Sequence, residues 1–137
     1  MKLLLDTHIV LDLLLDRKPY ADSAAELFSK VENGTVIGCL SGSTVTNVYY
    51  LAAKTVGAAR AQEEIRKLLT IFDVAPVNRP VLEAALAADF SDFEDAVIHE
   101  AACYVGAEAI ITRNQKDFKK SRIPVYTADE ITKILVL

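Results

Sequence analysis

The chain has 137 residues and a net charge of −4 at pH 7, and 52% of its residues are hydrophobic. This length suits one domain over residues 1–137, and the composition excludes a disordered chain. The net charge argues against non-specific electrostatic wrapping of nucleic acid. Because no apolar run reaches the length of a membrane span and the N-terminus lacks a signal-peptide pattern, we expect a cytoplasmic protein with no membrane partner.

The first predicted element is a short buried strand, Leu3–Leu5, which is followed at once by Asp6 and a helical stretch from Ile9 to Leu15. A short apolar run that enters a helix is typical of a parallel sheet, and such sheets bind their ligands beyond the carboxyl ends of the strands. Asp is also a favoured helix N-cap. Asp6 is therefore either a ligand-binding residue or only the cap of the helix that follows it.

Helices and strands continue to alternate along the chain. We expect helices at residues 22–33, 44–56, 58–69, 80–88, 91–104 and 127–135, and strands at 36–40, 72–77, 109–112 and 125–126. Thr127 and Glu130 have the spacing of a capping box at the start of the last helix. The alternation predicts an α/β fold, a three-layer sandwich around a central, mainly parallel sheet of about five strands.

Polar side chains follow the ends of three of these strands. They are Asp6 after the first, Ser41, Ser43 and Asn47 after the second, and Thr112, Arg113, Asn114 and Asp117 after the fourth. The carboxyl ends of parallel strands meet at one edge of a sheet, which is where a site would be assembled.

Residues 91–95 form the densest acidic cluster, at the start of a predicted helix. Ser91 and Glu94 have capping-box spacing, so we predict that Glu94 caps this helix, while Asp92 would be stabilised by the helix dipole. Asp95 lies one turn further on, in a helix that packs on the sheet. Mg²⁺ and Mn²⁺ prefer oxygen ligands and often take one or two carboxylates, so Asp6 and Asp95 would suit such an ion, which can activate water on a phosphodiester.

Other chemistries fit the sequence less well. It has no Gly-rich phosphate loop and no G-x-S-x-G elbow. A haloacid-dehalogenase-type phosphatase would require Asp where His8 stands. His8 and His99 are interpreted as packed or surface residues, and Cys39 and Cys103 as small buried hydrophobic residues.

Four segments spread over almost the whole chain carry a resemblance to a known family. They read LLLDTHIVLDLLLDR, STVTNVYYLAAK, DFEDAVIHEAA and IITRNQKDF. In this order and at these separations they resemble the PIN domain family, which includes the VapC toxin ribonucleases of toxin–antitoxin pairs. The resemblance implies a metal-dependent endoribonuclease with Mg²⁺ or Mn²⁺, an RNA substrate, a small antitoxin partner and homodimerisation.

Carried onto this chain, the resemblance assigns metal binding to Asp6 and Asp95 and catalytic roles also to Asp92 and Asp117. Residues expected to line the site are Thr7, Asn47, Glu94, Thr112 and Asn114. The family usually has glutamate at the position of Asn47, and many members have aspartate at that of Asn114. Each change removes a negative charge and would weaken metal binding unless Asp92, Glu94 or Asp117 compensates. We interpret the chain as a member of a subgroup with Asn in the middle motif.

A basic run follows the fourth strand, beside the predicted metal site. It is either a solvated face or a surface for the RNA backbone, formed by Arg113, Lys116, Lys119 and Lys120. Three functions stay open: a VapC-like toxin ribonuclease, a PIN-like module without efficient metal binding that contacts RNA or protein, and a phosphatase-like or receiver-like α/β protein. The third leaves the late motifs unexplained.

Overall fold

The computed structural model describes residues 1–136 and contains a five-stranded, all-parallel sheet in the order β3-β2-β1-β4-β5. The strands are β1 (Lys2–Leu5), β2 (Ile37–Ser41), β3 (Asp73–Ala75), β4 (Ala109–Ile111) and β5 (Val125–Tyr126). The predicted α/β fold and its parallel sheet are confirmed. β1 lies at the centre, so the ends of β2, β1 and β4 are neighbours at one edge.

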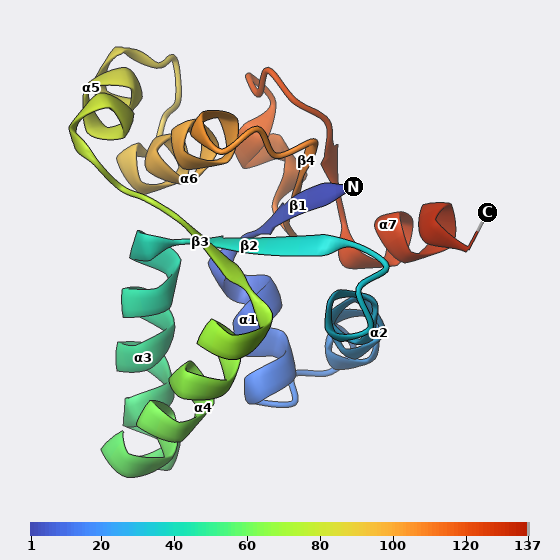
Figure 1. Cartoon of the computed structure of the whole chain (residues 1–137). Helices are drawn as coiled ribbons and strands as arrows, with labels where there is room; N and C mark the ends of the chain where they lie inside the picture. Colours follow the sequence, from blue (N-terminus) through green and yellow to red (C-terminus); the bar gives the residue numbers. More distant parts are fainter. Residues whose placement is uncertain (137) are drawn as a thin grey trace.

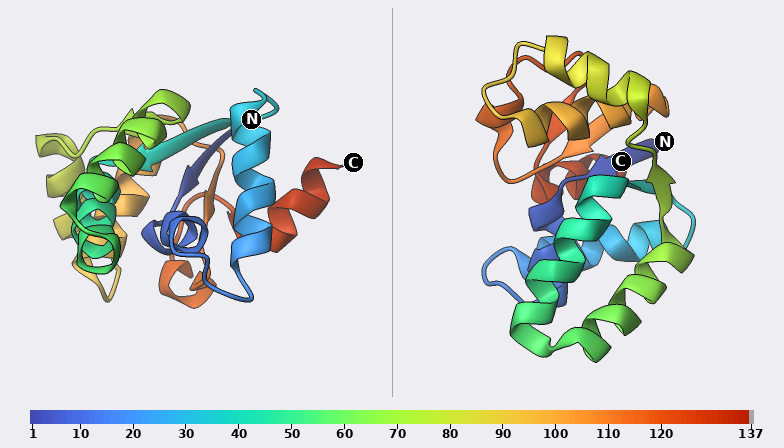
Figure 2. Two further views of the ribbon diagram at one scale, coloured as in Figure 1. Left: turned by 90° about the horizontal axis from the view of Figure 1, so that it is seen from below. Right: turned by 90° about the vertical axis from the view of Figure 1, so that its left-hand side faces the viewer.

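Seven α-helices surround this sheet in the described part of the chain. They are α1 (Thr7–Leu14), α2 (Ala21–Glu32), α3 (Gly42–Val56), α4 (Ala58–Ile71), α5 (Arg79–Ala87), α6 (Phe93–Tyr104) and α7 (Ala128–Leu135), with a short 3₁₀ helix, η1 (Gln115–Phe118). Figure 1 shows α5 and α6 on one face of the sheet and α1, α2 and α7 on the other. The hairpin of α3 and α4 extends away from α5 and α6 (Figure 2). Within residues 1–136, no helix is long and apolar enough to cross a membrane.

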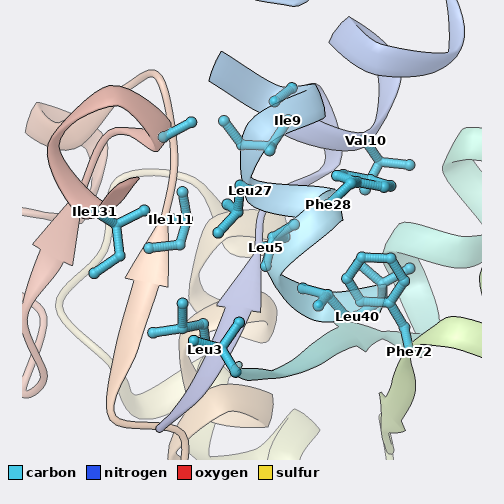
Figure 3. Close-up of a cluster of buried hydrophobic side chains, with 14 of the residues drawn as sticks. Leu3, Leu5, Ile9, Val10, Leu27, Phe28, Leu40, Phe72, Ile111 and Ile131 are labelled. Carbon is cyan, nitrogen blue, oxygen red and sulfur yellow. The ribbon is translucent and has the colours of Figure 1, made fainter. Parts of the chain in front are cut away.

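The two hydrophobic cores follow from the alternation of side chains along the strands. Leu3 and Leu5 belong to the larger core, where they pack with Ile111 of β4 beneath α1 and α2 (Figure 3). Leu4 and Ile110 belong to the other core, beneath α5 and α6. Because β1 is buried on both faces, it reads as a continuous apolar run in the sequence.

The third predicted strand, at 72–77, is shorter than expected and consists of Asp73–Ala75. Phe72 lies outside it because its backbone amide still donates to the Leu68 carbonyl oxygen at the end of α4. Its ring packs edge-on against Phe28, with centroids 5.1 Å apart. The same ring lies over Gly38 of β2, where an added Cβ would come within 2.6 Å of it. This part of β2 therefore requires glycine to let Phe72 pack.

The pairing of β1 with β4 determines which residues meet at the edge of the sheet. Leu5 is in register with Ile111, and the Asp6 amide donates to the Ile111 carbonyl oxygen at 2.9 Å. Asp6 and Thr112, which follow these strands, are thereby held side by side. Ser41 at the end of β2 caps α3 by accepting from the Thr44 amide, so that helix begins at Gly42 and not at Thr44.

Candidate metal centre

An open pocket of about 470 Å³ lies at this edge of the sheet. Its walls come from the start of α1, from α3, from the start of α6 and from the segment after β4. The lining residues are Asp6, Thr7, His8, Asn47, Tyr50, Leu51, Asp92, Glu94, Asp95, Asn114 and Asp117. The structure thus brings the four acids assigned to catalysis into one cavity, together with Asn47, Glu94 and Asn114.

Asp6 is held from two sides at the floor of the pocket. One carboxylate oxygen accepts from the Thr7 amide at 2.7 Å, and the other accepts from the Thr112 hydroxyl at 2.8 Å. Asp6 is therefore the N-cap of α1 and also a lining residue, so the two roles considered for it are compatible. Burial raises the pKa of Asp6, and the hydrogen bonds from Thr112 and Thr7 oppose that rise.

Asp95 faces the same pocket from the first turn of α6. Burial and the neighbouring carboxylates of Asp92, Asp6 and Asp117 raise the pKa of Asp95 to about 7. No Lys or Arg lines the pocket among residues 1–136 to balance these acids. Like charges brought together in this way destabilise one another, and a bound divalent cation would remove the repulsion.

The predicted capping box at the start of α6 is wrong. The cap is Asp92, whose carboxylate accepts from the Asp95 amide at 3.3 Å, and the helix begins at Phe93. Glu94 instead accepts from the Asn47 side-chain amide at 2.8 Å and connects α6 to α3. The Asp92 side chain reaches the Asp95 amide, which has no partner within the helix, while Glu94 is hydrogen-bonded by Asn47 from α3.

This contact gives a physical reason for Asn at position 47. The side-chain amide of Asn47 donates to Glu94 and still has a carbonyl oxygen, which is a neutral acceptor. A glutamate at this position would face Glu94 with a second negative charge. The Asn47–Glu94 pair therefore keeps one carboxylate at the pocket wall.

Buried hydroxyl groups connect the elements behind the pocket. The Thr7 and Thr44 hydroxyls lie 3.0 Å apart, and the Ser41 hydroxyl donates to that of Thr44 at 3.2 Å. Thr112, besides donating to Asp6, accepts from the Asn114 amide at 3.1 Å. The ends of β1, β2 and β4 are in this way fixed relative to one another.

The basic run divides into two parts. Arg113 faces away from the acids: its Nε lies 3.2 Å from a carboxylate oxygen of the fully buried Asp12, and its guanidinium group stacks 4.1 Å from the Tyr20 ring centroid. The Asp12 contact is an ion pair without hydrogen-bond geometry. Sequence reasoning missed Asp12, whose signal was a single acid within an apolar stretch.

Lys116, Lys119 and Lys120 line a second cavity, of about 310 Å³. Asp117 lines both this cavity and the acidic pocket, so the two are neighbours. Lys120 lies 3.7 Å from Asp89 across an exposed surface, where such a pair contributes little to stability. These three lysines, unlike Arg113, lie beside the acids.

A second group of charged side chains, also missed from the sequence, joins the buried His99 and Glu100 of α6 to the exposed Arg122. The Arg122 guanidinium donates to both Glu100 oxygens, at 3.1 and 2.9 Å. The Arg122 backbone amide donates to His99 Nε2 at 3.0 Å, so the His99 proton is on Nδ1 and is donated to Glu100 at 2.7 Å. Arg122 lowers the pKa of Glu100, and burial lowers that of His99. His99 is thus packed, as its interpretation from sequence had it.

The fit of a divalent ion rests on the donor set of the acidic pocket. Among residues 1–136, no three His, Cys, Asp or Glu side chains are placed as a ready-made metal site. Mg²⁺ is commonly held by one or two carboxylates, with water and substrate phosphate as its other ligands. Asp6 and Asp95, in a pocket that no Lys or Arg of residues 1–136 lines, match that mode of binding.

This fold and acidic edge define an α/β protein with a candidate metal centre. The sequence profile of the PIN domain matches residues 2–116, so the chain belongs to the PIN domain family. No curated protein matches the chain significantly.

Solved structures share the fold. A toxin–antitoxin complex from Klebsiella pneumoniae has 27% identity and a TM-score of 0.69, over 91% of this chain and 96% of that one. VapBC-1 from nontypeable Haemophilus influenzae has 19% identity and a TM-score of 0.70, over 94% and 99%. VapC20 from Mycobacterium tuberculosis, a toxin that cleaves the sarcin-ricin loop, has 18% identity and a TM-score of 0.64, over 79% and 86%.

Proposed function

We propose that the protein is a Mg²⁺- or Mn²⁺-dependent endoribonuclease and the toxin of a toxin–antitoxin pair, inhibited by a small antitoxin. The observation that carries the proposal is the group of carboxylates around Asp6 and Asp95, which line one pocket without a Lys or Arg from the described residues 1–136. Membership of the PIN family and the similarity to structures of toxin–antitoxin complexes support it.

Asp6 and Asp95 would hold the ion. When bound, it would lower the pKa of a water molecule and stabilise negative charge on the phosphodiester. The hydrogen bonds from Thr7 and Thr112 fix the orientation of Asp6 before any ligand binds. Asp92 and Asp117 line the same pocket, where they would orient the attacking water and accept its proton.

The phosphates on either side of the cleaved bond need cations. Lys116, Lys119 and Lys120 line the adjoining cavity and would contact the RNA backbone. Arg113 is not part of this proposed surface, since Asp12 and Tyr20 already engage its guanidinium group. By anchoring Arg113, these contacts fix the segment that carries Thr112 and Asn114.

A cleavage assay tests the proposal. Purified protein is incubated with a mixture of RNA oligonucleotides in Mn²⁺ and in EDTA, alongside the variants Asp6→Asn and Asp95→Asn. We expect cleavage only with the metal, and a cleavage rate at least about a hundredfold lower in each variant. Replacing a residue that merely hydrogen-bonds to a metal ligand typically lowers activity by about 10- to 100-fold, so loss of a ligand itself should cost at least as much. Asp22→Asn, an exposed acid on α2 paired with Lys18, is the matched control and should cleave normally.

Two outcomes would contradict the proposal. Cleavage that survives in both variants would come from a contaminating nuclease. The absence of both cleavage and Mn²⁺ binding would instead favour a module that binds RNA or a protein partner, with Asn47 and Asn114 as the cause of weak metal binding.

A further inference from the structure

The acidic pocket is larger than a hydrated metal ion requires. Six water molecules at about 30 Å³ each fill less than half of its approximately 470 Å³. That volume falls within the range of about 300–1,000 Å³ that is typical of ligand sites. The pocket therefore has room for part of a substrate beside the ion.

The walls of the pocket differ in chemistry. Five of its eleven lining residues are acids, which come from the starts of α1 and α6 and from η1, and the lysine-lined cavity adjoins it at Asp117. On α3 the lining changes to Tyr50 and Leu51, which follow Asn47 by one helical turn. Phosphates are attracted to a bound cation and to lysines. Carboxylates can accept hydrogen bonds from the N–H groups at the edge of a base, but the flat face of a base needs an aromatic or apolar surface to stack on. The α3 wall is the surface that suits a base.

The Tyr50 side chain is both exposed and supported by a neighbouring ring, which favours stacking with a base. Its side chain is 62% exposed, although it is a large aromatic residue at the rim of a pocket. The ring of Tyr49 packs edge-on against it, with centroids 5.2 Å apart and planes at 79°. This packing supports the Tyr50 ring from one side, which lowers the entropic cost of ordering it against a ligand.

We propose that Tyr50 is a stacking platform for an unpaired nucleobase next to the cleaved phosphodiester, with Leu51 completing the apolar wall. This inference rests on the proposed nuclease function and adds a specificity-determining residue to it. Aromatic side chains stack on the face of any base, so Tyr50 would select for single-stranded RNA more than for a particular base. A base in a duplex is stacked and paired, and would not reach the ring.

The test measures binding of short fluorescent RNAs by anisotropy, with all proteins in an Asp95→Asn background to prevent hydrolysis. Oligouridylate is compared with a ribose-phosphate oligomer of equal length that lacks bases. We expect Tyr50→Ala to weaken binding of oligouridylate by about tenfold, within the range for loss of one base–aromatic stack, and Tyr50→Phe to stay within about twofold of the parent. Binding of the abasic oligomer should be the same for all three proteins.

Tyr104→Ala is the matched control, because Tyr104 is 56% exposed on α6 and does not line the acidic pocket. It should bind both RNAs like the parent. The proposal would be overturned if Tyr50→Ala weakened binding of both oligomers equally, or if it weakened binding of neither. The second result would indicate that the α3 wall contacts another partner, such as an antitoxin. These outcomes are separate from the nuclease test, since metal-dependent cleavage in the protein without the Asp95 change stands or falls independently of Tyr50.

Discussion

Two groups of charged side chains on α6 differ in how their charge is balanced. Asp95, in the first turn, faces Asp92, Asp6 and Asp117, and no Lys or Arg lines its pocket in the described chain. Glu100, further along the same helix, accepts two hydrogen bonds from Arg122 and one from His99. The pKa of Asp95 is raised to about 7, whereas the pKa of Glu100 is lowered.

This difference separates a structural use of charge from a ligand-binding use. Glu100 is buried and accepts charged hydrogen bonds from Arg122, whose side chain is largely exposed, so the Glu100 group stabilises the fold through these hydrogen bonds. Folding brings Asp95 close to three other carboxylates, and their mutual repulsion is not balanced by a Lys or Arg of residues 1–136 in their pocket. Acids placed in this way are typical of functional sites. The comparison predicts opposite effects when the two acids are changed in the same way.

The largest expected effect comes from replacing each acid by its amide. In EDTA, Glu100→Gln should lower the free energy of unfolding by about 2 kcal/mol, since it loses charged hydrogen bonds to Arg122. Asp95→Asn should raise it by about 1 kcal/mol, a value reduced for solvent screening because Asp95 is only partly buried. Urea unfolding measures both. Two changes of the same sign would break the comparison.

The acids of the Asp95 group were predicted from the sequence, whereas the Glu100 group was missed. Four acids of the pocket could be selected because they follow strands or begin a helix, where parallel sheets bind ligands. They are Asp6, Asp92, Asp95 and Asp117. The partner of Glu100 is Arg122, in a loop far along the chain, and no local pattern connects the two. The pairing of Asp12 with Arg113 was missed for the same reason, since it depends on how α1 packs beside the end of β4.

The two capping boxes show the same limit at short range. Thr127 and Glu130 form both hydrogen bonds of the box, as predicted. Ser91 and Glu94 have the same spacing but form no box, because Glu94 is engaged by Asn47 from α3. Local spacing therefore predicts a cap only where no side chain from another element competes for the acid.

A smaller effect concerns pH. Burial lowers the pKa of His99 from its ordinary value of 6.5, and its Nε2 is occupied by the Arg122 amide, so the folded protein resists protonation there. Below pH 6.5 the unfolded chain binds a proton that the folded one excludes, and stability is lost as pH falls through the lower folded pKa. The stability advantage of the wild-type protein over His99→Gln should therefore shrink by about 1 kcal/mol between pH 7.5 and 5.5.

Urea titrations of both proteins at the two pH values, in EDTA, measure this difference directly. Asp6, Asp12 and Asp95 also have raised pKa values and contribute to the pH dependence of stability. The comparison with His99→Gln removes this contribution, because it is common to both proteins. An advantage that grows as pH falls would mean that His99 is protonated in the folded state and that its cluster is balanced differently.

The central claim is that the acids around Asp6 and Asp95 bind a divalent cation. Its most direct test is the melting temperature of the protein with and without Mn²⁺, measured for the wild type, Asp6→Asn and Glu100→Gln. A ligand at about 100 times its Kd stabilises the folded state by about 2.7 kcal/mol, so we expect Mn²⁺ to raise the melting temperature of the wild type and of Glu100→Gln by about 5 °C or more. Asp6→Asn should show little change. An equal rise in Asp6→Asn, or no rise in the wild type, would contradict the account.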